Sequence, residues 1–335
     1  MRLLLVGDVM LGRLVNDVLR REPPDYAWGD CLAAFRAADA RVGNLECALS
    51  DTGDPFAYPD KVFHFKSDEA NVRSLLAAGF DAVSVANNHV LDFGEDAMAR
   101  TLDVLRGNGI AAAGAGRDLA EASRPCIVTA GGRRLGLIAF TDNEADWAAT
   151  ARRPGVFFVP VDLRDPRARH LQRVVGEAKA QVDVLVVSAH WGPNWGDEPP
   201  AEHVPFAHAL VDAGADVIFG HSGHVTRGIE SYRGRPILYC TGDFVDDYAV
   251  DPVDRNDRSF LFEVHLGPGE PTRIVLRPTV ITDFHAQLAR DPERGASVER
   301  MRRLCAAFGT PTEWRPEAGE LEVAVNPADR AARRR

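Results

Sequence analysis

The chain opens with Met1-Arg-Leu-Leu-Leu-Val-Gly-Asp8, a short apolar run that ends abruptly in a glycine and an aspartate. Similar runs rich in valine, isoleucine and leucine recur, as expected of buried strands: Ala40–Val42, Ala82–Val85, Leu135–Phe140, Val184–Ser188, Val217–Phe219 and Ile237–Tyr239. Stretches of helical periodicity lie between several of them: Leu32–Ala38, Glu69–Ala78, Gly94–Arg106 and His203–Ala213. This alternation predicts an α/β fold with a largely parallel central sheet and some added antiparallel strands.

The sequence changes character after Leu266. A turn cluster rich in glycine and proline is followed by Thr272–Leu276, which alternates like an edge strand, and later by an amphipathic helix over Ala296–Phe308. We therefore expect three parts: a catalytic domain over 1–266, a C-terminal strand and helix extension packed on it over 267–326, and a disordered basic tail over 327–335.

The composition is that of a globular protein, with 335 residues of which 45% are hydrophobic and 26% charged. The net charge of −10 argues against nucleic acid as a partner. No stretch approaches the roughly 20 apolar residues that a membrane helix needs, and the N-terminus lacks the pattern of a signal peptide. Five scattered cysteines without CxxC spacing predict neither a disulfide framework nor a structural zinc site, which favours a cytoplasmic location. The sequence leaves the oligomeric state open.

Most of the expected strands run directly into polar residues. After Gly7-Asp8, the strand ends carry Gly43-Asn-Leu-Glu46, Asn87-Asn-His89, His190-Trp191, Gly220-His-Ser-Gly-His224 and Gly242-Asp243. Because the carboxyl ends of parallel strands share one edge of a sheet, these residues should converge on one crevice.

The kinds of side chain at this crevice predict its chemistry. Carboxylates, an amide and imidazoles suit divalent manganese, with iron or zinc as alternatives. Six candidate ligands are too many for one tetrahedral zinc with an open position, but they suit two ions roughly 3.5–4 Å apart that share a bridging carboxylate and hydroxide. We therefore expect two divalent metal ions and a hydrolytic reaction.

Taken in order, these motifs resemble the bacterial CapA-type proteins, named for poly-γ-glutamate capsule biosynthesis, a branch of the calcineurin-like metallophosphoesterases. The similarity spans about residues 1 to 265. It implies a four-layer αββα sandwich with mixed sheets. It also implies that Glu46 bridges the two ions and that His89 faces the substrate. The implied metal ligands are Asp8, Glu46, Asn88, His190, His221 and His224.

The chain departs from the pattern of the superfamily at three places. Met10 stands where a histidine is usual, and the second motif has Asn44 and then Glu46 in place of an aspartate. In the last motif Ser222 occupies the place of a histidine. The resemblance therefore leaves open how strongly the first ion is held, and which of the two histidines in that motif binds a metal.

Several neighbouring residues admit two interpretations. Arg13 either pairs with a local carboxylate or clamps an anionic substrate. Asp92 either orients the preceding imidazole as part of the catalytic apparatus or caps the helix that follows, and we prefer the cap. Asn87 either contacts the substrate or serves as a turn residue. Trp191 and Trp195 either wall the cleft, where they would touch substrate, or simply pack.

The combined pattern predicts an enzyme that hydrolyses a phosphoester of a small anionic substrate. A metal-bridging hydroxide would be the nucleophile, and His89 would donate a proton or hydrogen bond toward the leaving group. One alternative keeps the metals but cleaves an amide, such as a γ-glutamyl linkage. The other is a non-catalytic component of poly-γ-glutamate synthesis or export.

Overall fold

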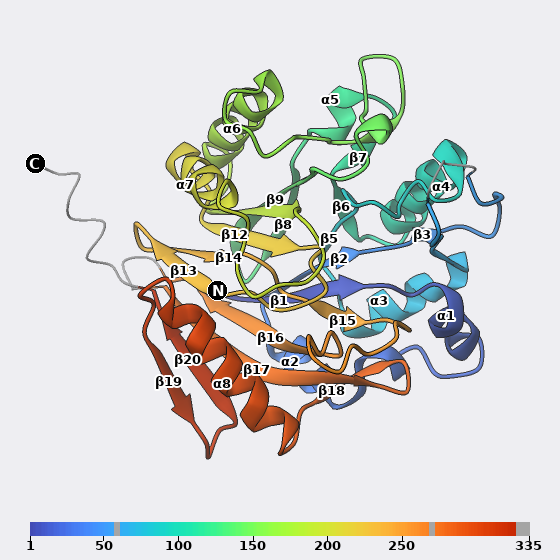
Figure 1. The fold of residues 1–335 in the computed structure, drawn as a ribbon. Coiled ribbons are helices and arrows are strands. Elements are labelled where there is room, and N and C mark those ends of the chain that lie inside the picture. Colours follow the sequence, from blue (N-terminus) through green and yellow to red (C-terminus); the bar gives the residue numbers. More distant parts are fainter. Residues whose placement is uncertain (57–60, 268–271, 326–335) are drawn as a thin grey trace, which may run out of the picture.

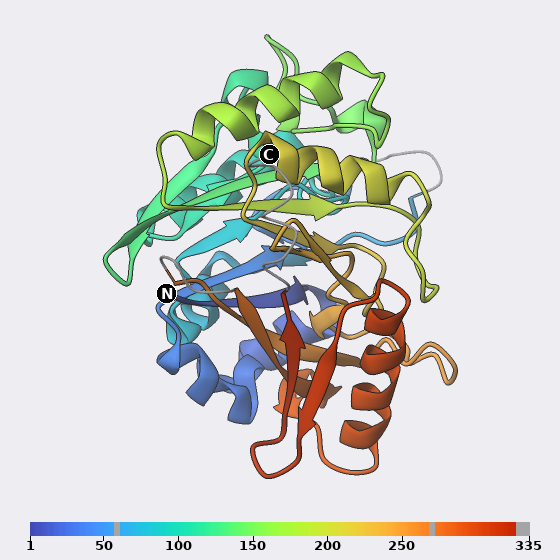
Figure 2. The ribbon, with the colours of Figure 1, turned by 90° about the vertical axis from the view of Figure 1, so that its left-hand side faces the viewer.

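The computed structural model describes residues 1–56, 61–267 and 272–325. Its framework is two mixed sheets that pack face to face (Figures 1 and 2). The predicted α/β class with mixed sheets is confirmed. The larger sheet has the order β19-β20-β17-β16-β1-β2-β5-β6, with β15 also paired to β1 and β18 to β17. The smaller sheet has the order β13-β14-β12-β11-β9-β8.

The strands of the larger sheet are β1 (Arg2–Val9), β2 (Ala40–Leu45), β5 (Ala82–Ser84), β6 (Ala111–Ala113), β15 (Asp243–Val245), β16 (Arg258–His265), β17 (Arg273–Thr282), β18 (His285–Leu288), β19 (Thr312–Arg315) and β20 (Glu320–Ala324). Those of the smaller sheet are β8 (Cys126–Ala130), β9 (Arg133–Thr141), β11 (Val184–His190), β12 (Val217–His221), β13 (Ile229–Tyr232) and β14 (Arg235–Leu238). Short pairs form from β3 (Ala48–Leu49) with β4 (Lys66–Ser67), and from β7 (Ala115–Gly116) with β10 (Gly155–Val156).

Most of the helices cover the outer faces of the two sheets, whereas α8 (Glu293–Ala306) packs at the core between them. The others are α1 (Arg13–Leu19), α2 (Leu32–Ala37), α3 (Val72–Ala78), α4 (Gly94–Gly107), α5 (Leu119–Ala122), α6 (Pro166–Lys179) and α7 (His203–Ala213). Short 3-10 turns occupy Tyr26–Cys31, Glu69–Asn71 and Ala145–Trp147. Figure 2 shows α6 and α7 on one side of the paired sheets and the blue N-terminal helices on the other.

Strand alternation explains the layers. Leu3 and Leu5 of β1 point into a core between the two sheets, whereas Leu4 and Val6 point into a second core beneath the N-terminal helices. Leu185 of β11 faces a third core, under α6 and α7. Three cores separate four layers, which is the αββα sandwich that the resemblance implies.

The parallel strands of both sheets bring the predicted strand-end residues to one edge. β1 runs parallel to β2 and to β15, and β11 runs parallel to β9 and β12. In the larger sheet Asp8 is in register with Asn44 on one side and Asp243 on the other. In the smaller sheet His190 is in register with His221.

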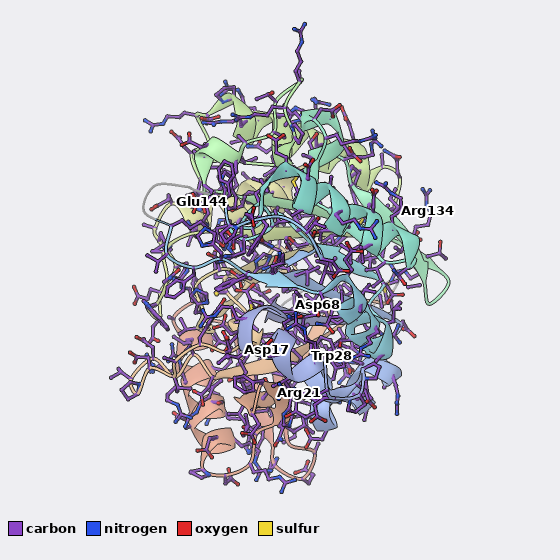
Figure 3. The ribbon with its side chains drawn as sticks, turned by 90° about the vertical axis from the view of Figure 1, so that its right-hand side faces the viewer. Asp17, Arg21, Trp28, Asp68, Arg134 and Glu144 are labelled. Carbon is purple, nitrogen blue, oxygen red and sulfur yellow. The ribbon has the colours of Figure 1, made fainter. Side chains whose placement is uncertain are left out.

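A surface ion-pair cluster fastens α1 to the segment before α3. Arg20 has Nε 2.7 Å from Asp68 Oδ2 and Nη1 2.9 Å from Asp17 Oδ1. Figure 3 labels both carboxylates beside α1. Exposed pairs of this kind contribute little to stability.

The C-terminal segment joins the larger sheet. The expectation of an edge strand at Thr272–Leu276 is wrong, because β17 is paired on both sides, with β16 and with β20. The expected helix is present as α8, and its buried side chains reach the core between the sheets. The predicted basic tail lies outside the described residues. Among the residues described, no helix combines the length and apolar character needed to cross a membrane.

Candidate functional site

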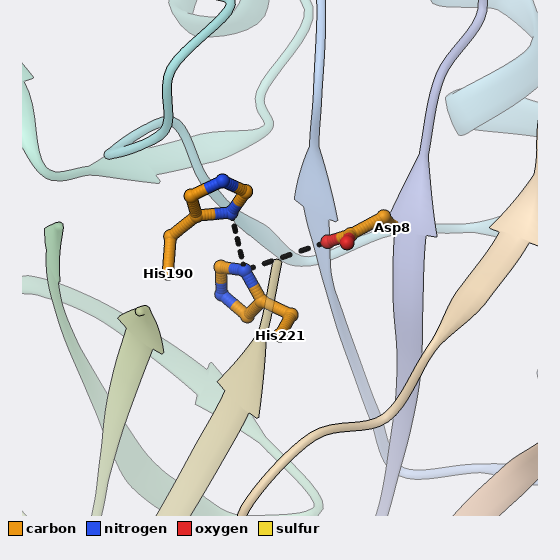
Figure 4. Close-up of side chains that lie close together, drawn as sticks. All are labelled: Asp8, His190 and His221. Carbon is orange, nitrogen blue, oxygen red and sulfur yellow. Dashed lines mark hydrogen bonds and ion pairs between the residues drawn. The ribbon is translucent and has the colours of Figure 1, made fainter. Parts of the chain in front are cut away.

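Asp8, His190 and His221 meet where the two sheets face each other (Figure 4). His221 Nδ1 lies 3.4 Å from Asp8 Oδ1 and 2.9 Å from His190 Nδ1. All three side chains are buried. Burial lowers the pKa of His221 to about 3 and that of His190 well below its usual value, so both imidazoles are neutral. A neutral imidazole is the form that binds a metal ion.

Asp8 belongs to a second possible ligand group, with His224 and Asp243. His224 Nδ1 lies 2.9 Å from Asp243 Oδ1. In each of the two groups, one ligand atom per residue lies within 4.8 Å of the others. Asp8 is therefore the residue that the two groups share.

Asp243 follows an expected strand in the sequence, but it is absent from the ligand set that the resemblance implies. Its partnership with Asp8 comes from the parallel pairing of β15 with β1, which sets the two aspartates in register. A signal was available, because Gly242-Asp243 repeats the Gly7-Asp8 pattern at the end of the first strand.

Several buried carboxyl groups gather at the site. Burial, followed by repulsion from Asp8 and Asp243, raises the pKa of Glu46 well above its usual value. Burial likewise raises the pKa of Asp8 to about 6, and that of Asp243 and Asp246 in the same direction. Within the described chain, buried oxygens of three of these carboxylates have no hydrogen-bond partner: Glu46 Oε2, Asp243 Oδ2 and Asp246 Oδ2.

These features test whether divalent cations fit the site. Buried carboxylates without partners are costly, and a nearby cation stabilises their charged form. The neutral imidazoles beside them supply nitrogen ligands without adding positive charge. The donor set of oxygen and nitrogen atoms therefore fits first-row divalent metals.

Glu46 and Asn88 approach His190 from the other side of its ring. Asn88 Oδ1 lies 2.9 Å from His190 Nε2, and Glu46 Oε1 lies 3.7 Å from the same nitrogen. The structure thus brings together all six residues that the resemblance implies as ligands. The bridging role of Glu46 stays a prediction, and Asp8 is the member common to the two groups found by geometry.

Asn44 and Asn87 form a chain of hydrogen bonds that leads to Asp8, one of the candidate ligands. Asn44 Nδ2 donates to Asp8 Oδ1 at 2.8 Å, and Asn87 Nδ2 donates to Asn44 Oδ1 at 3.0 Å. Asn87 Oδ1 accepts the backbone N–H groups of His89 and Val90. Asn87 is fully buried and is absent from the lining of the adjacent cavity. This matches its interpretation as a turn residue and not the expected substrate contact.

His89 is held by Asp92. Its Nδ1 lies 2.7 Å from Asp92 Oδ2, and its ring stacks on Phe65 with centroids 3.8 Å apart. Asp92 also accepts the Phe65 N–H at 2.7 Å. The preferred interpretation of Asp92 as a helix cap is wrong, because α4 begins at Gly94 and its N-cap is Phe93. Asp92 instead orients the imidazole, which was the other interpretation.

Lys61 braces this dyad and was not found from the sequence. Its Nζ lies 3.3 Å from Asp92 Oδ1 and donates to the backbone carbonyl of Asn88. The side chain is only 8% exposed, and Nζ sits 4.7 Å from the centre of the Trp147 ring. Lys61 belongs to no motif, so only the folded loop reveals its contacts.

A cavity of about 540 Å³ opens beside the ligand groups. His89, Asn88 and His224 line its inner part, and Arg13, Lys61, Phe63, Phe65, Trp195 and Tyr248 line the rest. Its volume is in the range of sites for small organic ligands.

Arg13 pairs with a local carboxylate, the first of its two interpretations. Its Nε lies 3.2 Å from Asp247 Oδ2, and its guanidinium lies 5.5 Å from the ring centres of both Phe63 and Phe65. It also lines the cavity. The carboxylate partner therefore holds the guanidinium at the cavity, and the role of Arg13 as an anion clamp stays a prediction.

The expectation that Trp191 walls the cleft is wrong. Its side chain is fully buried in the core under α6 and α7, and its indole donates to the Tyr239 carbonyl at 3.0 Å. Alternation along β11 is the reason, since His190 faces the other sheet and the next residue must face the helices. Trp195 is the tryptophan at the cavity and is 39% exposed.

Residues 2–248 match the sequence model of a family described as "Bacterial capsule synthesis protein PGA_cap". The chain belongs to the PGA_cap family. This confirms the resemblance to CapA-type proteins drawn from the strand-end motifs. The matched residues include all six implied ligands together with His89 and Asp92.

Relatives of the PGA_cap chain extend over nearly its whole length. A probable polyglutamine synthesis accessory protein of Mycobacterium tuberculosis is 33% identical over 364 residues, covering 94% of this chain and 93% of the relative. The PGA biosynthesis protein CapA of Bacillus subtilis is 29% identical over 328 residues, covering 97% and 82%. A crystal structure of a hypothetical protein from Thermus thermophilus superposes with a TM-score of 0.49 at 18% identity, covering 87% of this chain and 100% of that one.

Proposed function

We propose that this PGA_cap chain is a metal-dependent hydrolase of phosphoesters. The single observation that carries the proposal is the joining of two ligand groups through Asp8, next to a cavity lined by the oriented imidazole of His89. Structural ion-binding sites have no need of a positioned acid–base residue beside an open cavity. A hydrolytic site needs both.

Two divalent ions would be held by Asp8, His190 and His221 on one side and by Asp8, His224 and Asp243 on the other, with Glu46 and Asn88 next to them. Manganese is the proposed metal, and iron and zinc are the alternatives. When bound, such ions supply Lewis acidity toward the oxygens of an anionic ester.

His89 is the proposed proton donor to the leaving group. Burial lowers the pKa of its imidazole and raises the pKa of Asp92 to about 7. A protonated Asp92 would therefore donate to Nδ1 of a neutral ring that carries its own proton on Nε2, and as Nε2 gives this proton to the leaving group the Asp92 proton would pass to Nδ1. Asp92 occupies its Nδ1, which leaves Nε2 as the ring nitrogen available to a ligand. Phe65 holds the ring by stacking, and Lys61 holds Asp92. The imidazole is therefore presented in one orientation, as positioned acid–base catalysis requires.

The cavity also favours a small anionic substrate. Arg13 and Lys61 both line it, and both are anchored by carboxylates that keep their positive groups in place. A guanidinium recognises phosphate or carboxylate oxygens through paired hydrogen bonds.

All five cysteines are free thiols, in keeping with the proposed cytoplasmic location.

The names of the relatives favour a second candidate. One is called a PGA biosynthesis protein and another a polyglutamine synthesis accessory protein. The same residues would then serve hydrolysis of a γ-glutamyl amide, with Arg13 meeting a substrate carboxylate. A non-catalytic role in polymer synthesis would fit the names as well, but it leaves the His89–Asp92 pair without a purpose.

A substrate screen with matched variants separates these possibilities. The manganese-loaded protein is assayed against aryl phosphate monoesters and diesters and against a γ-glutamyl anilide, with Asp8→Asn as the inactive control. We expect turnover of an aryl phosphate that chelator and Asp8→Asn both abolish. Turnover of the anilide alone would favour the amide reaction. Protein that binds metal but turns over no substrate would favour the non-catalytic role.

A further inference from the structure

A second, smaller cavity lies between the first turns of α8 and the segment that leads into β16. Its volume is about 140 Å³. Three arginines line it: Arg255, Arg258 and Arg300. All three lie beyond residue 248, where the match to the family ends. We call this cavity the arginine pocket.

Polar atoms in the arginine pocket lack partners. Ser297, which lines the pocket, is only 5% exposed, and its hydroxyl has no hydrogen-bond partner among the described residues. The Nε atoms of Arg258 and Arg300 are also buried and unpartnered within that part of the chain. Leaving such donors unsatisfied costs free energy, so their convergence on one cavity indicates a missing acceptor.

Carboxylates pair closely with two of the three arginines that line the pocket. Asp257 engages Arg255 through two hydrogen bonds of 2.8 and 2.7 Å. Asp197 Oδ1 lies 2.7 Å from Arg300 Nη2, outside the lining of the pocket. Among the described residues, the ion pair of Arg258 is a long one, with its Nη2 3.8 Å from Glu293 Oε1.

Asp254 is a carboxylate that lines the pocket itself, and its negative charge would repel a bound anion. Its backbone carbonyl accepts a hydrogen bond from Arg300 Nη1 at 3.1 Å. Burial, followed by the charge of Arg255, lowers the pKa of Arg258, which shows that positive charge is crowded here. An arginine nevertheless stays protonated in proteins, so the positive charge persists.

We propose that the arginine pocket binds a single oxyanion of the phosphate or carboxylate type, through the guanidinium groups of Arg258 and Arg300 and the hydroxyl of Ser297. The pocket is smaller than the roughly 300–1,000 Å³ of sites for whole organic ligands, so one anionic group fits and a nucleotide does not. Guanidinium groups match the geometry of such oxyanions.

The location of the pocket connects it to the metal cleft. The segment that carries Arg255 begins just after Tyr248 and Ala249, which line the large cavity. An anion held between Arg258 and α8 would therefore fasten the far end of this segment, where β16 begins, to the C-terminal helix.

Site-specific labelling of arginines tests the proposal on the full, manganese-loaded chain. The protein is treated with phenylglyoxal in the presence of inorganic phosphate, of glutamate, or of chloride at matched ionic strength, and the modified peptides are quantified by mass spectrometry. We expect phosphate or glutamate to protect Arg258 and Arg300 while chloride does not. Arg302, exposed on the same helix and paired with Glu299, is the internal control and should label equally throughout.

Calorimetric titration of variants supplies the second measurement. Ser297→Ala and Arg258→Gln should each weaken binding of the protecting anion by about 10-fold or more, as expected for losing a hydrogen bond to a charged group. Arg302→Gln should leave it unchanged. An anion that binds in the metal cleft is told apart by the Asp8→Asn variant. This variant should lose the binding of anion in the metal cleft and keep the binding of anion in the arginine pocket.

The proposal is overturned if the labelling of Arg258, like that of Arg302, is the same in phosphate, glutamate and chloride. Protection of Arg258 by chloride would also overturn it. Protection by phosphate alone identifies a phosphate site, and protection by glutamate alone a carboxylate site. Should Arg258→Gln fail to fold, Ser297→Ala still decides, because it removes one oxygen and no charge. Neither result depends on hydrolytic activity, so failure here leaves the proposed function untouched.

Discussion

Asp243 lies in register with Asp8 and within contact of His224, yet it was not among the ligands that the resemblance implied. If it holds an ion, Asp243→Asn should leave the chain with about half its bound manganese and a lower affinity for the rest. Elemental analysis of the metal-loaded protein measures this. Asp118→Asn, which keeps a good cap on α5, is the control and should bind the full amount. Unchanged metal content in Asp243→Asn would mean that Asp243 binds neither ion.

His89 is the residue at which catalysis and metal binding should separate. His89→Asn should retain both ions but lower kcat by roughly 10²–10⁴-fold, the range for losing a positioned acid–base group. The loss should shrink for aryl esters with acidic leaving groups, because they need little protonation. Rates for two such esters, together with the metal content, decide the matter. Loss of a metal, or equal slowing of both esters, would make His89 a ligand or an electrostatic contact.

Asp92 acts through His89, so replacing Asp92 should lower kcat as His89→Asn does, but by a smaller factor. Asp92→Asn keeps a side chain of similar size but cannot hold the imidazole as a carboxylate does, at the 2.7 Å contact now seen. We expect kcat to fall by about 10-fold or more with KM nearly constant. The double variant with His89→Asn should be no slower than His89→Asn alone, because the effect of Asp92 passes through the ring. Additive losses would contradict the orienting role.

At the scale of a single element, α6 begins with a measurable cap. Asp165 accepts the Arg167 N–H at 2.8 Å and pairs with the Arg167 guanidinium at 2.7 Å. Asp165→Ala should cost about 1 kcal/mol of unfolding free energy at pH 7, and Asp165→Asn much less, as measured by urea denaturation. Equal costs for the two variants would mean that the charge, and not the cap, holds this helix end.

The same cap has a pH dependence with a definite sign. The hydrogen bond from Arg167 lowers the pKa of Asp165 to about 2, against an opposing effect of burial. A lowered carboxyl pKa adds stability above the unfolded value near 4, and that contribution is lost as the pH falls from 4 toward 2. The advantage of the wild type over Asp165→Asn should therefore shrink across this range. The effect should be small because the carboxylate is near solvent.

At the scale of the whole molecule, the ligand groups join the two sheets. Asp8 comes from the larger sheet, whereas His190 and His221 come from the smaller one. Ions that bind only this assembled site stabilise the native state by about 2.7 kcal/mol at 100 times Kd. Manganese should therefore raise Tm by several degrees in thermal unfolding, and chelator should reverse it. Asp8→Asn should show no manganese-dependent shift, and an equal shift in that variant would indicate binding outside the site.

Much of the fold and of the site followed from local patterns in the sequence. Apolar runs that end in Gly7-Asp8, in Asn88, or in His190 and His221 predicted parallel strands whose ends meet, and the structure brings these residues together. The inference worked because strand periodicity and the shared edge of parallel strands are properties of the backbone. Periodicity likewise predicted α7 over His203–Ala213 with its observed bounds, and α4 from Gly94 to within one residue of its observed end at Gly107.

Tertiary structure alone decided the remaining contacts. Asp243 meets Asp8 because β15 pairs with β1 across more than two hundred residues, and Lys61 reaches Asp92 from a loop without periodicity. The arginine pocket likewise joins α8 to a segment before β16. Sequence patterns report which face of a strand or helix a residue occupies. Which faces then meet depends on long-range pairing and packing, whose energies are summed over the whole chain and leave no mark at a single position.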